Sequence, residues 1–371
     1  MTEQECLAKM IAPGQVRPSK PYRGGVIQVH VTRACNQACF HCTQGSNFGG
    51  KAAFMPPEMF RQACRSLKGY FGVVGMFGGN PATHPQFREL CAVMREEVPA
   101  DQRGLWCNDP MTLENAVEMR RTFAPGISNL NVHLDQKAFD LFKQGWPECN
   151  PVGLTQDSRH GPVFLAMKDV VWTTCPTCQN GGAFSSIDCP TCQGKGIVRD
   201  NEKIWELISG CDINQKWSAM VGMFRSSLRA WFCEVAGAQS ILHQDEPDYP
   251  DTGFDPTDRY YKGKIERDDA IIYTVNETVA MTGVEEVRWW QMPIYSFASQ
   301  VRKHCFDCGV PLRGRGELAM AQEGVEQVSA AHAEIAKPKR RGRQVVVVDS
   351  VEQLGVERLG AFTNYIGNAR S

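Results

Sequence analysis

Three cysteines, Cys35, Cys39 and Cys42, stand in the spacing C-x3-C-x2-C. They follow the apolar, β-branched run of residues 25–31, which predicts a buried strand with the cysteines on the loop at its carboxyl end. Three thiolates on one loop can bind three irons of a [4Fe–4S] cluster and leave the fourth iron open to another molecule. The alternative is burial in the core or a zinc site, because free cysteines are often buried and a lone C-x2-C usually binds zinc.

This spacing directly after a strand resembles the signature of the radical S-adenosylmethionine (radical SAM) superfamily. The resemblance implies that the open iron chelates the amino and carboxylate groups of SAM. It further implies that an electron from the cluster splits SAM into methionine and a 5′-deoxyadenosyl radical, which abstracts hydrogen from a substrate. An external one-electron reductant, of the flavodoxin or ferredoxin type, would supply the electron.

A second motif, Gly78-Gly79-Asn80-Pro81, follows a second predicted strand over residues 71–77. It resembles the radical SAM "GGEP" motif, in which the backbone contacts the amino group of SAM, and glycines permit such a close approach. Asparagine replaces the usual glutamate, so the resemblance carries over the backbone role and not a carboxylate role. A Gly-rich turn without a ligand is the alternative.

Two further residues end predicted strands. Asn108 follows the strand at residues 104–107 and resembles the "TNG" ending of many radical SAM third strands, with Cys107 in the threonine position. His133 lies in a strand predicted over residues 130–135, which resembles the "SLDG" of peptide-modifying members with histidine in place of serine. The resemblance implies that these residues line the SAM ribose or the substrate; the alternative for His133 is a hydrogen-bonded core histidine.

Helices are predicted over residues 57–70, 85–98 and 111–123 between these strands, and a fifth strand is predicted over residues 162–171. Repeated strand–helix units predict an α/β fold with a parallel sheet and right-handed crossovers. Ligands of such sheets bind at the carboxyl ends of the strands, where all the motifs above fall. The resemblance implies a partial (β/α)6, TIM-like barrel over roughly residues 22–240.

A doubled C-x2-C pattern interrupts the barrel at Cys175, Cys178, Cys189 and Cys192. Two such pairs fit a tetrahedral zinc held by four thiolates, and an insertion of this kind folds around its metal. The repeats resemble the knuckles of the DnaJ zinc-binding domain. A rubredoxin-like iron or a second cluster is the alternative.

Another C-x2-C pair, Cys305 and Cys308, lies beyond the predicted barrel. It resembles part of the SPASM or twitch extension, which implies an auxiliary iron–sulfur cluster with upstream cysteines, Cys233 first and Cys211 next. The full SPASM series is missing, so a zinc knuckle or a turn without metal stays open.

Composition limits the remaining choices. Lysine plus arginine number 40 against 41 aspartate plus glutamate, which argues neither for nor against a nucleic-acid partner. The start of the chain does not resemble a signal peptide, and no apolar run approaches the ~20 residues that span a bilayer. With 16 cysteines, many in metal-ligand pairs, we expect a reducing cytoplasmic location, no membrane partner and several metal sites.

The predicted division is 1–21 as an N-terminal extension, 22–172 and 198–243 as the core, 173–197 as the four-cysteine insertion, 244–315 as a C-terminal extension, 316–344 as a linker and 345–371 as a closing segment. A weak helix is predicted over residues 319–336, a helical region over 268–283 and a strand from residue 345.

The favoured function is a radical SAM enzyme acting on a peptide, a protein or a small molecule. The alternatives are a nucleic-acid-modifying radical SAM enzyme, a zinc-finger protein that binds nucleic acid without catalysis, and an iron–sulfur electron carrier. The four-cysteine insertion and the basic residues 337–343 favour nucleic acid. Neither non-catalytic alternative explains why the cysteine triad and the Gly-Gly-Asn-Pro turn share one sheet edge.

Overall fold

A computed structural model describes residues 1–16, 25–39, 42–46, 48, 53–133, 135–153, 163–179, 189–216, 218–261, 286–312, 325–332, 344–347 and 349. Every statement below about the structure concerns these residues.

A six-stranded, mostly parallel sheet forms the centre of the molecule, in the order β4-β3-β2-β1-β7-β8. Five of the strands run parallel to their neighbours, and β8 is antiparallel to β7. The strands are β1 (Val26–Thr32), β2 (Val73–Gly78), β3 (Arg103–Cys107), β4 (Asn129–Leu130), β7 (Ser218–Phe224) and β8 (Ser227–Trp231). This arrangement confirms the predicted α/β class and is consistent with a partial TIM-like barrel.

Strand β1 lies in the middle of the sheet and is buried along its whole length. Both faces of β1 are covered, so the polar side chains of Gln28 and His30, which alternate with Ile27, Val29 and Val31, are buried as well. Val26, Val73, Phe77 and Trp106 form a small core of their own, separate from the main core that contains Ile27. The sheet is therefore packed on both faces.

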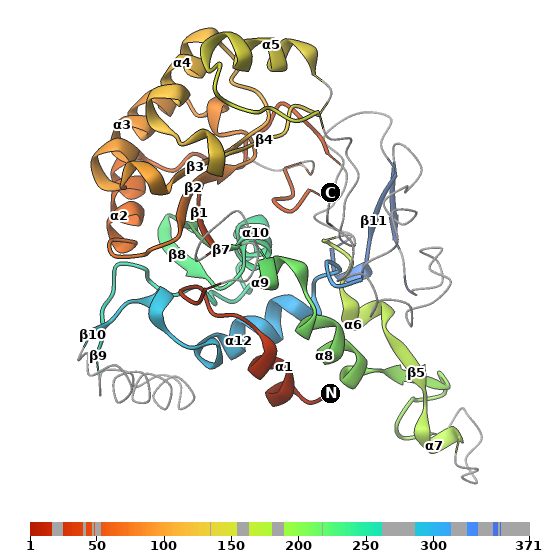
Figure 1. The fold of residues 1–371 in the computed structure, drawn as a ribbon. Coiled ribbons are helices and arrows are strands. Elements are labelled where there is room, and N and C mark those ends of the chain that lie inside the picture. Colours follow the sequence, from red (N-terminus) through yellow and green to blue (C-terminus); the bar gives the residue numbers. More distant parts are fainter. Residues whose placement is uncertain are drawn as a thin grey trace, which may run out of the picture.

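Four helices follow the first four strands and lie along one side of the sheet (Figure 1). They are α2 (Pro57–Ser66), α3 (Phe87–Glu97), α4 (Leu113–Thr122) and α5 (Gln136–Gly145). Proline occupies the first position of α2, where the missing N–H costs nothing. Thr112 and Asp135 cap α4 and α5 by accepting hydrogen bonds from backbone N–H groups. The first three helices were predicted, and α5 was not.

The prediction of a fifth strand over residues 162–171 was wrong. Val163, Phe164, Leu165 and Ala166 form a buried turn, and α6 (Met167–Val170) follows. Phe164 and Ala166 bond to Ser329 instead of a sheet neighbour: the Ser329 N–H donates to the Phe164 carbonyl over 3.1 Å, and the Ala166 N–H donates to Ser329 Oγ over 3.0 Å. The fifth parallel strand is β7, which pairs with β1 and not with β4.

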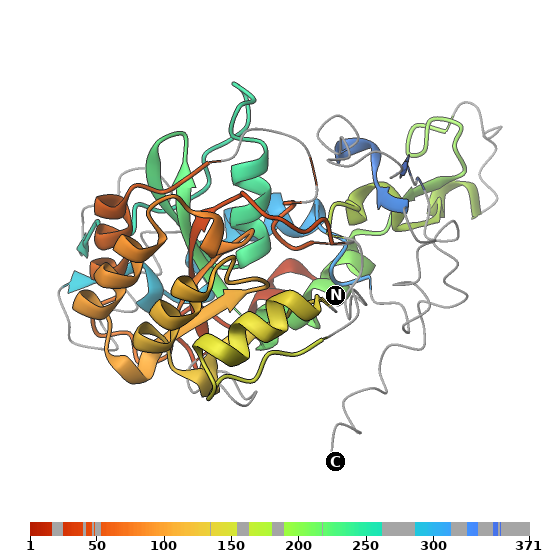
Figure 2. The same ribbon diagram turned by 90° about the horizontal axis from the view of Figure 1, so that it is seen from above.

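The four-cysteine insertion consists of β5 (Trp172–Thr174), α7 (Pro176–Gln179) and β6 (Ile197–Arg199). Strands β5 and β6 pair antiparallel and form its base. The insertion projects away from the six-stranded sheet in both views (Figures 1 and 2). It leads into α8 (Asn201–Ser209) and α9 (Asp212–Lys216), which precede β7.

The C-terminal part returns to the core after the β7–β8 hairpin. Its elements are α10 (Glu234–Leu242), β9 (Tyr260–Tyr261), β10 (Glu286–Val287), α12 (Ala298–Gln300), a π-helical turn (Val301–Cys305), β11 (Val325–Val328) and β12 (Gln344–Val347). The strand predicted from residue 345 is confirmed as β12. The helix predicted over residues 319–336 was wrong where the structure describes it, because residues 325–328 pair with β12 as a strand. The helical region predicted over residues 268–283 lies outside the described residues.

The N-terminal segment packs against the core beyond its first helix. Helix α1 (Glu3–Lys9) begins with a capping box between Thr2 and Glu5. Beyond it, the side chain of Asn214 accepts from the Ile11 N–H and donates to the Ile11 carbonyl, each over 2.9 Å. Asn214 is buried, so these two bonds attach the start of the chain to the core.

Short 3-10 turns lie at Pro81–Thr83, Ala100–Gln102, Pro125–Ile127, Trp289–Gln291, Ile294–Phe297 and Ala330–His332. In the part of the chain that the structure describes, no helix is long and apolar enough to cross a membrane.

Candidate metal and cofactor sites

The cysteine triad lies on the loop that leaves the carboxyl end of β1. Cys35, Cys39 and Cys42 are partly exposed, and none of the 16 cysteines forms a disulfide. The backbone N–H of Gln37 donates to Cys35 Sγ over 3.4 Å, a contact that favours the thiolate form needed for metal binding. The donor set therefore fits the cluster that the sequence predicts.

A network of side-chain amides braces this loop against the ends of β2 and β3. Asn36 accepts from Asn80 Nδ2 over 3.1 Å and from Asn108 Nδ2 over 2.9 Å, and it donates to a carboxylate oxygen of Asp109 over 2.7 Å. Asn108 Oδ1 lies 3.9 Å from Cys35 Sγ. The residues predicted from separate motifs are thus brought to one sheet edge.

The two glycines of the Gly-Gly-Asn-Pro turn allow the end of β2 to approach the cysteine loop. A Cβ on Gly78 would lie 2.3 Å from the Thr32 carbonyl oxygen, and one on Gly79 would lie 2.3 Å from that of Ala34. Gly78 also has φ +152°, a conformation that disfavours other residues. The backbone N–H groups of Gly79 and Asn80 donate to Thr32 and Ala34, over 2.8 and 2.7 Å. The close approach shown by the structure is therefore between two segments of the protein.

His133 reaches the triad from the loop after β4. Its Nε2 lies 3.3 Å from Cys39 Sγ, and its Nδ1 is buried without a hydrogen-bond partner in the structure. Burial lowers the pKa of His133, so the ring is neutral at physiological pH. The strand predicted over residues 130–135 is shorter in the structure, where β4 ends at Leu130 and His133 has φ +47°.

Arg33 is a charged residue of this site that the sequence did not reveal. It is 8% exposed, and its guanidinium interacts electrostatically with Asp245 and with the thiol of Cys42. Burial lowers the pKa of Arg33, and these two neighbours oppose that effect. A cation is thus held beside the loop.

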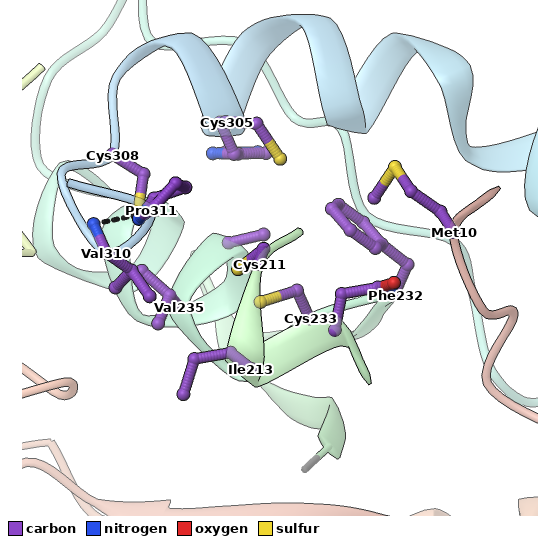
Figure 3. A pocket seen from close by; sticks show the side chains of 13 residues that line it. Met10, Cys211, Ile213, Phe232, Cys233, Val235, Cys305, Cys308, Val310 and Pro311 are labelled. Atoms are coloured by element: carbon purple, nitrogen blue, oxygen red, sulfur yellow. Dashed lines mark hydrogen bonds between the residues drawn. The ribbon is translucent and has the colours of Figure 1, made fainter. Parts of the chain in front are cut away.

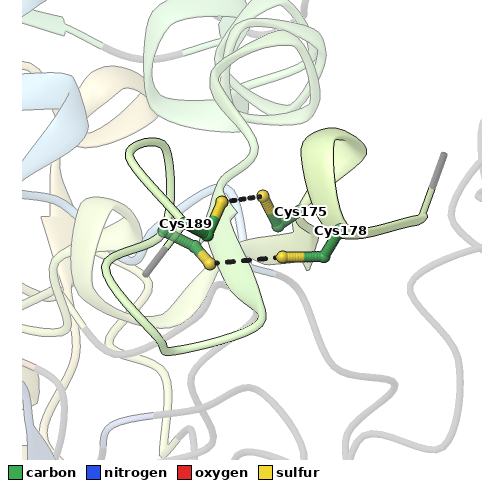
Figure 4. A group of neighbouring side chains, drawn as sticks. Cys175, Cys178 and Cys189 are labelled. Atoms are coloured by element: carbon green, nitrogen blue, oxygen red, sulfur yellow. Dashed lines mark hydrogen bonds between the residues drawn. The ribbon is translucent and has the colours of Figure 1, made fainter. Parts of the chain in front are cut away.

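The four cysteines of the insertion converge on one point (Figure 4). The sulfurs of Cys175 and Cys189 lie 3.8 Å apart and those of Cys178 and Cys192 lie 3.6 Å apart. All four lie within 4.8 Å of one another. Ligands on a tetrahedron with metal–sulfur bonds of ~2.3 Å stand about 3.8 Å apart, so the spacing is that of a single-ion site. The predicted four-cysteine metal site is present.

Backbone N–H groups that point at the sulfurs favour the thiolate form of the cysteines in this site. The N–H groups of Cys192 and Thr191 lower the pKa of the Cys189 thiol to about 6. The Gly196 N–H donates to Cys192 Sγ over 3.3 Å. The turn that carries them contains Gln193, Gly194 and Gly196 at positive φ, which folds the knuckle tightly.

A second group of four cysteines lines a small apolar pocket (Figure 3). Cys211 precedes α9, Cys233 precedes α10, and Cys305 and Cys308 follow α12. The remaining lining residues are mostly apolar, among them Met10, Ile213, Phe232, Val235 and Val310. Burial and the neighbouring thiols raise the pKa values of Cys305 and Cys308 well above the ordinary value. The structure thus places Cys305 and Cys308 beside both upstream cysteines that the sequence suggested.

Sequence reasoning missed several residues of these sites. Cys6 on α1 interacts electrostatically with Cys211 and Cys305, although it lies about 200 residues before the first of them. Asn36 and Asp109 directly follow Cys35 and Asn108, so their position beside predicted site residues was the signal that could have found them.

Comparison with known proteins agrees with this geometry. The family model "Radical SAM superfamily" matches residues 29–135, a span from β1 to the beginning of α5 that includes the triad, the Gly-Gly-Asn-Pro turn, Asn108 and His133. Over this span the chain is similar to radical SAM enzymes, a class whose cofactors are a [4Fe–4S] cluster and SAM.

No curated protein matches the chain. One solved structure that does is titled "Crystal structure of BtrN in complex with AdoMet and 2-DOIA"; it is 12% identical, and the match covers 60% of this chain and 82% of that chain with a TM-score of 0.31. A likeness this weak carries no argument about function.

Proposed function

We propose that Cys35, Cys39 and Cys42 hold a [4Fe–4S] cluster whose fourth iron binds SAM, and that the enzyme abstracts hydrogen from a peptide, a protein or a small molecule. The observation that carries this proposal is the convergence of three partly exposed thiols with the residues of the other motifs at the carboxyl edge of one parallel sheet. When bound, the cluster supplies the electron that splits SAM into methionine and the 5′-deoxyadenosyl radical.

The protein's own residues are proposed to bind and orient SAM and the substrate at this edge of the sheet. The backbone of residues 78–81 packs against the loop and is proposed to contact the SAM amino group, as in the family motif that it resembles. The neutral ring of His133 carries an unpartnered Nδ1 that can form one hydrogen bond with SAM or substrate. Asn108 fixes the loop beside Cys35 and is proposed to line the same cleft.

We propose further that the four-cysteine insertion holds a structural Zn²⁺ and resembles the DnaJ zinc-binding knuckles in its chemistry. Four thiolates close the coordination sphere, which leaves no open position for catalysis. The insertion has few apolar residues of its own, and its separate core consists of Cys175, Cys189 and Cys192 with Cys178 and Val198 beside them. Metal binding is then the main source of its stability.

The second four-cysteine group, Cys211, Cys233, Cys305 and Cys308, is proposed to hold an auxiliary iron–sulfur cluster. The four thiols line one buried pocket, and Cys305 and Cys308 interact electrostatically with Cys211 and Cys233. Four cysteines gathered in this way are a donor set that an iron–sulfur cluster uses. Four protein ligands would leave no iron open to substrate and would suit electron transfer.

Reductive cleavage of SAM tests the main proposal. Anaerobically reconstituted protein should form 5′-deoxyadenosine with a strong reductant, and Cys39→Ala should abolish this while its insertion keeps its metal. Cys64→Ala is the matched control, because Cys64 is a buried thiol on α2 outside all three sites. Substantial 5′-deoxyadenosine from the Cys39→Ala protein would overturn the assignment.

Iron analysis tests the auxiliary centre. A variant with Cys35, Cys39 and Cys42 all replaced by alanine should retain roughly four irons with matching sulfide if the pocket holds a [4Fe–4S] cluster. Iron near zero with a second zinc per chain would show that the pocket binds zinc instead.

A further inference from the structure

We infer that Asn80 is a positioning residue: it holds Asn36, and through it the loop at Cys35, and it does not contact SAM. This inference rests on the proposed cluster at Cys35, Cys39 and Cys42. Asn80 stands where the family motif has a glutamate, and the inference gives it a structural role in place of a contact with SAM.

The side chain of Asn80 has no hydrogen-bonding capacity left for a ligand. A carboxamide offers two N–H donors and an oxygen with two lone pairs. Both donors are used, toward Asn36 Oδ1 over 3.1 Å and the Asp109 carbonyl over 2.9 Å. The oxygen accepts from the Ala82 N–H over 3.3 Å and from Cys107 Sγ over 3.1 Å. Asn80 is fully buried, so SAM could reach this amide only after the network had opened.

The same hydrogen bonds hold the cysteine loop against the ends of β2 and β3. Asn36 is the residue after Cys35, and its side chain bonds to Asn80, Asn108 and Asp109. Asp109 is itself fixed, because its other carboxylate oxygen accepts from the Met111 N–H over 2.7 Å. The peptide beside Cys35 is thereby held in one orientation, which sets the direction of its thiolate.

The network explains why an amide stands at position 80. A carboxylate has no donor, so it would face the oxygens of Asn36 and Asp109 across two former hydrogen bonds. A buried anion without partners is strongly unfavourable, and the side chains around it would have to rearrange. The amide is therefore required by the loop.

The main test is Asn80→Asp in the full-length reconstituted enzyme. We expect the half-life of iron at the triad against a chelator to fall by about tenfold, because two buried hydrogen bonds are lost. The fraction that keeps its cluster should bind SAM with an unchanged Kd. Asn201→Asp is the matched control, since it adds the same charge at the exposed start of α8. An unchanged half-life together with weaker SAM binding would show that Asn80 contacts SAM and would overturn the inference.

A rescue variant separates positioning from general damage. Asn80→Asp combined with Asp109→Asn lets the Asn36 amide turn over, donate to the new carboxylate and accept from the new amide, at the cost of the hydrogen bond from Asn108 Nδ2. Iron retention should recover in part, and no recovery would contradict the network as described. Should Asn80→Asp not fold, Asn36→Ala tests the same contacts on a partly exposed loop residue, and retention equal to wild type would contradict the inference.

The proposed cluster and the Asn80 network can be tested separately. If the wild type holds no more iron than the variant lacking Cys35, Cys39 and Cys42, the proposed cluster is wrong. The network can then still be measured in metal-free protein, where alkylation of Cys35 should be faster in Asn80→Asp than in wild type. Equal alkylation rates would refute the positioning role by itself.

Discussion

The contact between Gly79 and the cysteine loop gives the sharpest test of how the sheet edge is built. In Gly79→Ala the new Cβ would lie 2.3 Å from the Ala34 carbonyl oxygen and 2.9 Å from that of Arg33. Both neighbours are backbone atoms and cannot turn away as a side chain would. The loop must therefore move by several tenths of an ångström.

The size of the effect follows from these contacts. Overpacking of a tight contact costs about 1–3 kcal/mol. The shift also strains the bonds from Gly79 N to Thr32 and from Asn80 N to Ala34, each worth about 0.5–1.5 kcal/mol. A total of about 2–4 kcal/mol corresponds to a fall in melting temperature of roughly 3–5 °C for a chain of 371 residues, whose unfolding entropy is ~2.1 cal/mol/K per residue. We expect iron at the triad to fall with it, because Ala34 adjoins Cys35.

The assay is a thermal melt together with iron and zinc analysis of the same preparation. Gly126→Ala is the control: neither glycine has a positive φ, but nothing lies within 4 Å of the Cβ built on Gly126. The control should change the stability by less than about 1 kcal/mol. A Gly79→Ala protein with the melting temperature and iron content of wild type would refute the argument that close packing sets the loop.

Three further outcomes are expected. Replacing Cys175 and Cys178 by serine should remove the metal of the insertion and make it sensitive to protease, while SAM cleavage continues; retention of that metal would contradict the four-thiolate site. Burial lowers the pKa of His30 in the folded protein to about 3, against about 6.5 in the unfolded chain. Between these two pH values the unfolded state binds more protons, so the free energy of unfolding falls by up to about 1.4 kcal/mol for each unit by which the pH is lowered. His30→Leu should therefore reduce the loss of melting temperature between about pH 7 and about pH 5, and an equal loss in both proteins would contradict this. Asn214→Ala removes the two hydrogen bonds between the Asn214 side chain and Ile11, and it should speed hydrogen exchange in residues 1–16 about tenfold or more. The control Arg302→Ala removes only an exposed ion pair to Glu3 and should leave this exchange unchanged.

Local sequence patterns predicted the first half of the fold. The β-branched run of β1, the proline that begins α2 and the glycines after β2 each specify structure within a few residues, and the structure agrees. The motif residues could be placed at one edge because parallel strands end on the same side.

Long-range contacts explain what the sequence did not predict. Residues 163–166 are apolar and buried, but they pack against Ser329, and an apolar run alone does not distinguish a strand from other buried segments. The pairing of β7 with β1 and the meeting of Cys6 with Cys211 likewise join residues far apart in the chain. The residues that flank these two contacts in the sequence carry no pattern that predicts them.

The pocket of Cys211, Cys233, Cys305 and Cys308 also constrains the order of biosynthesis. Its wall includes Met10 near one end of the chain and Pro311 about 300 residues later. The ribosome synthesises the chain from its N-terminus, so Met10 is made long before Pro311. The pocket cannot form until both residues are present. A metal centre in this pocket would consequently form only after most of the chain has been made, whereas the side chains of the triad and its amide network all come from residues 35–133.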